Sequence, residues 1–171
     1  MACNLALGFL RDCSDSIGGI EEILISERGN FTFVEANHEV SAITQTAATN
    51  FYKYELKKEV GSYISTMTID PANGTRFADS LLAFSINKMS AAKSNELKLM
   101  VLGQIGIIVK DNNGDYWGLG FQNYAEGKSL IANTGTVFGD RSGYDIELSA
   151  KEPEIPYAID SSIIAGLSVS P

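Results

Sequence analysis

Hydrophobic and polar residues alternate along most of this chain, and a period of two is typical of β-strands. Six such runs predict strands at about 20–28, 31–36, 40–46, 51–56, 63–69 and 82–86. In the fifth run both faces carry large residues, as Tyr63 and Ile64 show, so we expect this strand to pack on both faces. In the sixth, Phe77 and Leu81 also suit a helix, and both interpretations stay open.

One segment changes to the period of a helix. Leu97, Met100 and Val101 follow the i, i+3, i+4 spacing. Ser90 before them is a suitable N-cap, and Gly103 after them is a suitable residue just beyond a helix end. The sequence therefore predicts one flanking α-helix, at about 91–102, that packs against a sheet.

Turn residues organise the second half of the chain. Asn113-Gly114 between two apolar runs predicts a β-hairpin over 105–119, because Asn-Gly in that setting is a strong short-range hairpin signal. Further turns are predicted at 70–74 and 139–143, while the apolar segment 159–167 is either a last strand or a docking segment. The sequence as a whole predicts a mainly β sandwich or barrel, in a single domain over residues 1–171.

Charge narrows the functions that this fold can serve. The chain has 171 residues and a formal net charge of −8, and its acidic residues concentrate in 1–30 and 121–171. Proteins that grip DNA phosphates carry clustered Lys and Arg, so the acidity argues against tight DNA binding. It is compatible with a solvated acidic surface, or with an acidic lining that DNA slides past.

The reactive side chains are few. The single histidine, His38, is predicted to be a surface or turn residue rather than a general base. Cys3 and Cys13 match no metal or redox spacing, and reduced thiols are favoured over a disulfide. No secretory signal and no run of about 18 apolar residues is evident, so we expect synthesis in a cytoplasm and no membrane partner.

The remaining motifs argue against catalysis. Residues 111–115 mimic the start of a calcium loop but lack its later Gly and Glu, so a hairpin turn is favoured. Glu21 and Glu22 are expected on opposite faces of a strand, and Asp12 and Asp15 in Asx-turns. No phosphate-binding loop or complete dinucleotide fingerprint is present. We therefore predict a non-enzymatic protein with no catalytic, cofactor-binding or metal residues.

Two aromatic segments suggest binding instead. Lys53 lies among the aromatic residues of 51–56, and Lys57 and Lys58 follow them directly. This arrangement suits base stacking but fits better a strand with a core side and a solvent side. The Tyr-, Trp- and Asp-rich hairpin 111–119 motivates a second hypothesis, a soluble β-sandwich module that binds a sugar or peptide through Trp117. An enzyme with an unusual carboxylate pair is the least favoured alternative.

Several segments in order resemble bacteriophage tail tube proteins. The similar segments are a Ser- and Gly-containing opening, a Tyr-rich strand, a strand-to-helix junction, a hairpin and late turns, at 13–20, 51–56, 82–100, 107–120 and 134–144. The similarity spans about residues 13 to 168 and contains no catalytic motif.

This resemblance implies a specific function. Tube proteins are β-sandwiches with a flanking helix that form stacked rings, usually hexameric, whose inner strands join into one β-barrel around the DNA. The chain would then be a structural virion protein of the viral tail. It would form a homo-oligomer that contacts neighbouring tail or connector proteins, and genome DNA would pass through its lumen during ejection. An acidic lumen would repel DNA phosphates. Candidates for contacts between rings are the 57–80 hairpin, the acidic N-terminal segment and the apolar C-terminal segment. Head–tail connectors, terminator rings, tail hubs and secreted tubes of contractile machines share this fold and remain alternatives.

Overall fold

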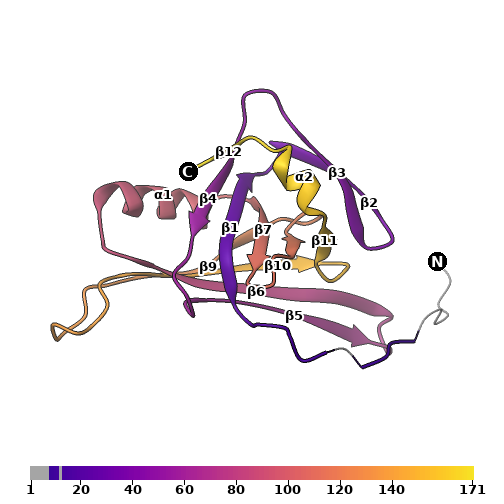
Figure 1. Cartoon of the computed structure of the whole chain (residues 1–171), viewed down its shortest axis with the longest axis horizontal. Helices are drawn as coiled ribbons and strands as arrows, with labels where there is room; N and C mark the ends of the chain where they lie inside the picture. The colour runs from indigo at the N-terminus through magenta and orange to yellow at the C-terminus, as the bar shows by residue number, and fades with distance from the viewer. Residues whose placement is uncertain (1–7, 12) are drawn as a thin grey trace.

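The predicted mainly β fold is confirmed by a computed structural model, which describes residues 8–11 and 13–171. In this part of the chain twelve strands form one connected sheet (Figure 1). The strands are β1 Ile20–Glu27, β2 Phe31–Ala36, β3 Glu39–Gln45, β4 Phe51–Glu55, β5 Gly61–Asp70, β6 Thr75–Asn87, β7 Ile105–Asp111, β8 Tyr116–Leu119, β9 Ala125–Asn133, β10 Gly143–Glu152, β11 Tyr157–Ile159 and β12 Val169–Ser170. The helices are α1 Ala91–Leu102 and α2 Ser161–Ala165.

The antiparallel pair β1 and β7 forms the centre of the sheet, with Ile23 opposite Val109 and Ile25 opposite Ile107. β4 continues the sheet beyond β1, and β8 continues it beyond β7. A single pair, Ile105 with Ala125, connects β7 to β9. Beyond it, β9, β10, β6 and β5 form a long antiparallel group, here called the four-stranded layer.

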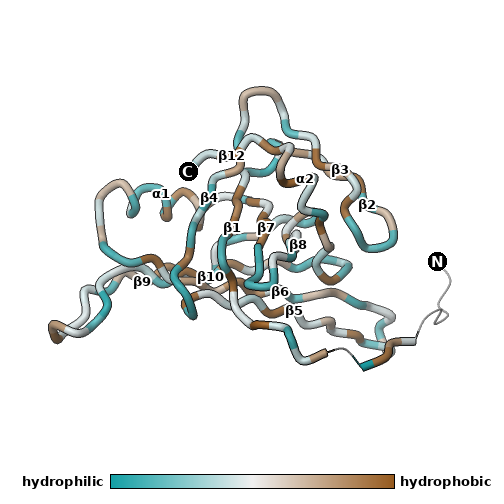
Figure 2. Tube along the Cα trace, in the orientation of Figure 1, coloured by the Kyte–Doolittle hydropathy of each residue, from teal (hydrophilic) through white to brown (hydrophobic). Residues whose placement is uncertain are grey.

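The central pair separates two hydrophobic cores. Ile23 and Val109 face the first core, which the four-stranded layer and α1 close. Leu24 and Ile108 face the second core, together with Phe31 and other apolar residues of β3, β4 and β11. Because neighbouring residues enter different cores, β1 and β7 carry apolar residues on both faces. Figure 2 shows hydrophobic positions along this central pair. This double burial explains the consecutive apolar residues Ile23 to Ile25 of β1 and Ile107 to Val109 of β7.

The predicted helix is confirmed within its predicted bounds. The Ser90 hydroxyl accepts a hydrogen bond from the Lys93 amide at 3.3 Å, and Leu97 and Met100 are buried in the first core. α1 lies close to β9, where a Cβ on Gly127 would stand 2.4 Å from the Val101 carbonyl oxygen. Glycine at that position is therefore required by the close approach of helix and strand.

The structure corrects three expectations. The apolar segment 159–167 is not a last strand: after Ile159, where β11 ends, it forms the short helix α2, which packs against the second core of its own chain. β5 packs on one face only: Tyr63 lies against the first core, whereas Ile64 on the opposite face is 61% exposed. The helical alternative at 77–82 is also wrong, because these residues pair with β5 and β10 as part of β6.

Candidate functional site

The hairpin between β7 and β8 is organised by one aspartate. The Asp111 carboxylate accepts hydrogen bonds from the amides of Asn113 and Asp115, at 2.8 and 3.0 Å, and from Trp117 Nε1 at 3.4 Å. Partial burial raises the pKa of Asp111, but these bonds outweigh it and the pKa is lowered. The segment that mimics a calcium loop is thus a hairpin turn, as predicted.

The tip of this hairpin holds the chain's N-terminal segment. The Ile17 amide donates to Asn113 Oδ1 at 2.7 Å, and Asn113 Nδ2 donates to the Ile17 carbonyl at 3.0 Å. The neighbouring Asn112 side chain donates to the Gly18 carbonyl at 2.7 Å. Two side-chain amides therefore bind the backbone of residues 17–18 much as an adjacent strand would.

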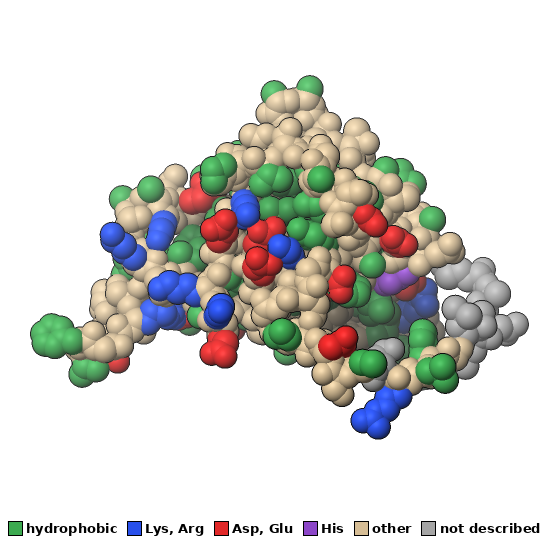
Figure 3. Space-filling view, in the orientation of Figure 1, with side chains coloured by type: hydrophobic (Ala, Val, Ile, Leu, Met, Phe, Trp, Pro, Cys, Tyr) green, Lys and Arg blue, Asp and Glu red, His purple; other side chains and the backbone are tan. Residues whose placement is uncertain are grey.

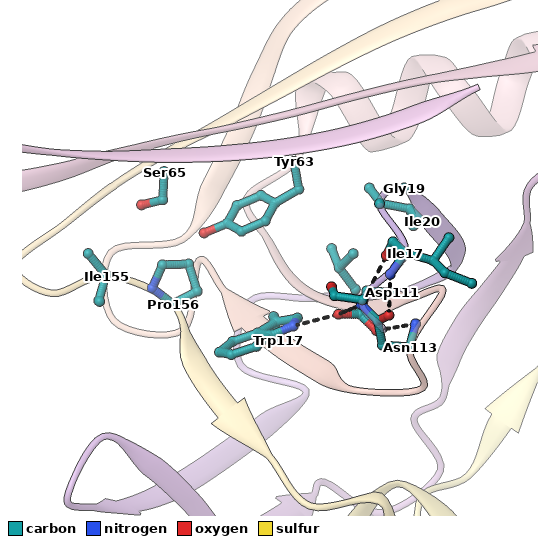
Figure 4. Close-up of a pocket in the computed structure, with 13 residues that line it drawn as sticks. Ile17, Gly19, Ile20, Tyr63, Ser65, Asp111, Asn113, Trp117, Ile155 and Pro156 are labelled. Carbon is teal, nitrogen blue, oxygen red and sulfur yellow. Dashed lines mark hydrogen bonds between the residues drawn. The ribbon is translucent and has the colours of Figure 1, made fainter. Parts of the chain in front are cut away.

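This arrangement borders an open cavity of about 500 Å³ between the N-terminal segment, β5 and the β7–β8 hairpin (Figure 4). Tyr63 and Ser65 of β5 lie on one wall, and Trp117 of β8 lies on the opposite wall. Ile155 and Pro156 close one end, and Ile17 lies at the other.

The Tyr63 hydroxyl is the unusual group of this cavity. Its oxygen is buried and makes no hydrogen bond within the described residues, although the hydroxyls of Ser65 and Ser80 lie nearby and bond each other at 2.9 Å. Burial raises the pKa of Tyr63, and the two serines partly oppose this effect, so the phenol is neutral. An unpaired buried hydroxyl costs about 1–3 kcal/mol, and a group bound in the cavity would provide its missing partner.

His38 belongs to a turn, as predicted. With Asn37 it joins β2 to β3, and both residues have positive φ, 53° and 68°. The ring Nε2 lies 3.0 Å from the Pro156 carbonyl oxygen, and the ring packs 5.0 Å from that of Tyr157. His38 therefore fixes the chain before β11, next to the end wall of the cavity.

The other candidate side chains serve local structure. Glu21 bonds Lys110 at 2.7 Å and Glu22 bonds Lys53 at 2.8 Å, so the adjacent carboxylates have different partners on the two strands flanking β1. Asp15 is exposed and accepts no hydrogen bond from the described residues, so its expected Asx-turn is absent. Cys13 is exposed. Asp12 and Cys3 lie outside the described residues, so the prediction about the two thiols stays a prediction.

The aromatic strand β4 has the two environments that were expected of it. Phe51 is completely buried in the second core, whereas Tyr52 is 43% exposed. Lys53 lies between Glu22 and Glu55, whose hydrogen bonds raise its pKa. Since this lysine is already paired, only Lys57 and Lys58 of the basic cluster are free to attract an anion.

The second candidate surface is the outer face of the four-stranded layer, which points away from the first core. Its side chains are mixed in character. The polar and charged residues that line the shallow hollows on it are Thr66, Thr68, Asp79, Lys128, Ser149, Lys151, Glu59, Ser62, Ser85, Asp145 and Glu147, and the apolar ones are Ile64, Leu81, Val60, Ala83, Phe84 and Ile146. Lys128 lies 3.5 Å from Glu147 and Lys151 lies 3.8 Å from Asp79. Asp145 is also paired, with Arg141, whereas Glu126 of β9, opposite Ser149, has no ion pair among the described residues. The face therefore carries spaced ion pairs and one further carboxylate.

Many of the terminal acidic residues are engaged locally. Glu152 is 2% exposed and accepts hydrogen bonds from the amides of Gly120 and Gln122, both at 2.8 Å. Asp140 caps the loop 134–142, and hydrogen bonds from the Val137 and Thr136 amides lower its pKa. Asp160 caps α2 by accepting a hydrogen bond from the Ser162 amide. The sequence charge thus overstates the number of unpaired surface carboxylates.

The loop 134–142 between β9 and β10 has an exposed apolar tip. The sequence pattern predicts a turn in this region but not the apolar tip. Val137 is 66% exposed and Phe138 is fully exposed. Figure 3 shows a hydrophobic cluster where this hairpin projects from the body of the molecule. The signal available in the sequence was the apolar pair Val137-Phe138 inside a run of turn residues.

Comparisons with known proteins do not identify a family. A search of protein-family models found no match, and a search of curated proteins found no similar one. Among the described residues, no cluster of three or more His, Cys, Asp or Glu side chains is placed to hold a metal ion. In the same part of the chain, neither helix has the length and apolarity to span a bilayer.

Proposed function

We propose that this chain is a structural, non-enzymatic subunit of a virion, which forms stacked rings that make a phage tail tube. The observation that carries the proposal is the four-stranded layer, whose outer face is uncovered and whose two outer strands have unpaired edges. Within the described residues β5 pairs only with β6, and β9 beyond Ala125 pairs only with β10.

Free edges on opposite sides of one layer suit head-to-tail association. When β5 of one copy pairs with β9 of the next, each added copy again presents a free edge, and a constant rotation closes a ring. Closure removes the exposed edges, which otherwise favour aggregation. The four-stranded layers would then join into one barrel, with α1 and both cores outside it.

The character of the outer face supports its use as a lumen. Its polar residues and ion pairs, such as Lys128 with Glu147, leave few unpaired cations to bind phosphates. Glu126, which has no ion pair among the described residues, would repel a passing polyanion, so DNA would slide rather than adsorb.

Contacts between rings are best assigned to the projecting hairpins. The β5–β6 hairpin exposes Ile69 and Phe77, and the β9–β10 tip exposes Phe138. The C-terminal segment is a weaker candidate, because Ile163 and Ile164 already pack against the second core of their own chain. A connector, terminator or hub ring of the same fold would use the same edges but not stack further.

Electron microscopy of the purified protein tests the proposal. We expect rings or tubes of constant bore, and Phe138→Asp should shorten the tubes while leaving rings of the same diameter. Lys98→Glu, an exposed charge change on α1, is the control. A wild-type protein that stays monomeric at high concentration would contradict the proposal.

A further inference from the structure

We propose that the cavity between Tyr63 and Trp117 binds a neutral carbohydrate unit of one or two pyranose rings. The site lies on the core side of β5, away from the outer face assigned to the lumen, and it does not depend on ring formation. Four observations carry the inference: the shape of the cavity, its charge, its aromatic wall and its unpaired hydroxyl.

The shape favours a compact ligand. The volume of about 500 Å³ falls in the range of about 300–1,000 Å³ typical of small-molecule pockets. Pro156 closes one end and Ile17 lies at the other, so the space between β5 and β8 is limited in length (Figure 4). One or two sugar rings suit such a space better than an extended peptide, which must leave through both ends.

The charge favours a neutral ligand. Among the described residues, the lining contains no Lys or Arg to hold an anionic group. Asp111 is the one carboxylate among these lining residues, and both of its oxygens already accept bonds from the hairpin, from Asn113 and Trp117 among others. The carboxylate is therefore engaged in the turn rather than available to a cation.

The walls combine an aromatic surface with hydroxyl groups, which is the combination that a sugar requires. The face of an aromatic ring is electron-rich and attracts the weakly positive C–H groups on the apolar side of a pyranose, a role for Trp117. Ser65 and Ser16 contribute hydroxyls to the lining. The Tyr63 hydroxyl, which has no partner among the described residues, is placed to pair with a sugar hydroxyl.

Tryptophan fluorescence gives a direct test, because Trp117 is the only tryptophan of the chain. Glucose, galactose, N-acetylglucosamine and their β-linked disaccharides are titrated against the whole protein, and calorimetry repeats any titration that saturates. We expect a saturable spectral shift with at least one of these sugars. Tyr63→Phe should weaken that binding about fivefold, the effect of one neutral hydrogen bond.

Two glycine substitutions test whether a sugar binds in this cavity or elsewhere on the protein. An added Cβ on Gly18, in the cavity lining, meets no atom within 4 Å, so Gly18→Leu should fold and obstruct the cavity. Gly139→Leu introduces the same side chain into open space in the distant loop 134–142 and is the matched control. Calorimetry should show binding lost in Gly18→Leu and in Trp117→Ala, and kept in Gly139→Leu. Unchanged binding in Gly18→Leu, or no saturable response to any of the sugars, would overturn the proposal.

Discussion

Asn113 and Ile17 are joined by two hydrogen bonds, although 96 residues separate them in the chain. The pairing attaches the N-terminal segment to the β7–β8 hairpin and thereby forms one end of the cavity. Asn112 holds the next two residues, by its side chain to the Gly18 carbonyl and by its amide to the Gly19 carbonyl, whereas the Ile17 side chain is 63% exposed.

Replacing Asn113 should detach the segment without unfolding the protein. In Asn113→Ala both bonds are lost, and because they are exposed we expect the free energy of unfolding to fall by only about 1 kcal/mol. Amide hydrogen exchange at Ile17 should become at least about tenfold faster, as expected for local opening. The control is Asn73→Ala, whose side chain bonds only Asp70 within its own turn. Unchanged exchange at Ile17 would show that other contacts hold the segment.

Removing the Tyr63 hydroxyl should not weaken the fold. Since its oxygen is buried and unpaired, we expect Tyr63→Phe to leave the free energy of unfolding unchanged or to raise it by about 1 kcal/mol. Tyr144→Phe is the matched control, because the Tyr144 hydroxyl bonds Ser94 and the Ser90 carbonyl, and its loss should cost about 1–2 kcal/mol. Urea unfolding measures both, and a large loss in Tyr63→Phe would reveal a partner for that hydroxyl.

Neutralising the buried carboxylate of Glu152 should be strongly destabilising. Glu152→Gln replaces one acceptor oxygen by an NH₂ group, which then faces the amide of either Gly120 or Gln122. We expect a loss of about 2–3 kcal/mol in urea unfolding. Glu154→Gln, which removes a more exposed ion pair with Arg76, should cost less than about 1 kcal/mol. Equal losses would mean that the two amides find other acceptors.

Stability should fall in acid through Asp111 and Asp145. The pKa of Asp145 is lowered from the ordinary 3.8 by hydrogen bonds from Ser85 and Arg141, and that of Asp111 is lowered by its turn. A carboxylate with a lowered pKa stabilises the fold at pH values above its unfolded pKa, and this contribution is lost as pH falls through the folded pKa. The free energy of unfolding should therefore drop from about pH 4 downward.

Variants of these residues test the assignment. Asp111→Asn and Asp145→Asn should be less stable than the wild type at pH 7 and should show a flatter decline in acid. Asp15→Asn is the control, because the Asp15 carboxylate accepts no hydrogen bond from the described residues. A decline as steep in both variants as in the wild type would assign the acid sensitivity to other groups.

Charge on the outer face of the four-stranded layer should control DNA passage if that face lines a lumen. Reversal of Glu126 and Glu147 to Lys should slow DNA ejection from intact tails, because added cations attract phosphates, and lower salt should enlarge the effect. Glu27→Lys, an exposed change on β1, should leave ejection unchanged. Unaltered ejection from well-formed double-variant tails would argue against an electrostatic lumen.

The fold was predictable where its signals are local. The Asn113-Gly114 turn, the Ser90 cap and the alternation in β1 to β6 each depend on residues close in sequence, and the structure agrees with them. The prediction that β5 packs on both faces was wrong because it took apolar residues on both faces of a strand as a sign that both faces are buried within one chain. Ile64 is instead exposed on an uncovered layer, and a single sequence does not distinguish a core from an interface between copies.

The candidate cavity depends on contacts that no local pattern encodes. Trp117 was singled out from its hairpin, but its position opposite Tyr63 follows from the pairing of distant strands. The pairing of Asn113 with Ile17 is equally remote. The short helix α2 was missed because five residues after Asp160 are too few to establish a helical period.

The double burial of β1 and β7 has a consequence for how the molecule comes apart. Ile23 and Leu24 are neighbours, yet each belongs to a different core, so neither core can be exposed to water without disrupting the same strand pair. We therefore expect both to melt in a single cooperative transition, in which Ile23→Ala and Leu24→Ala lower one common melting temperature. The shared strand pair therefore couples the two cores mechanically as well, so a pull that opens one core should open the other.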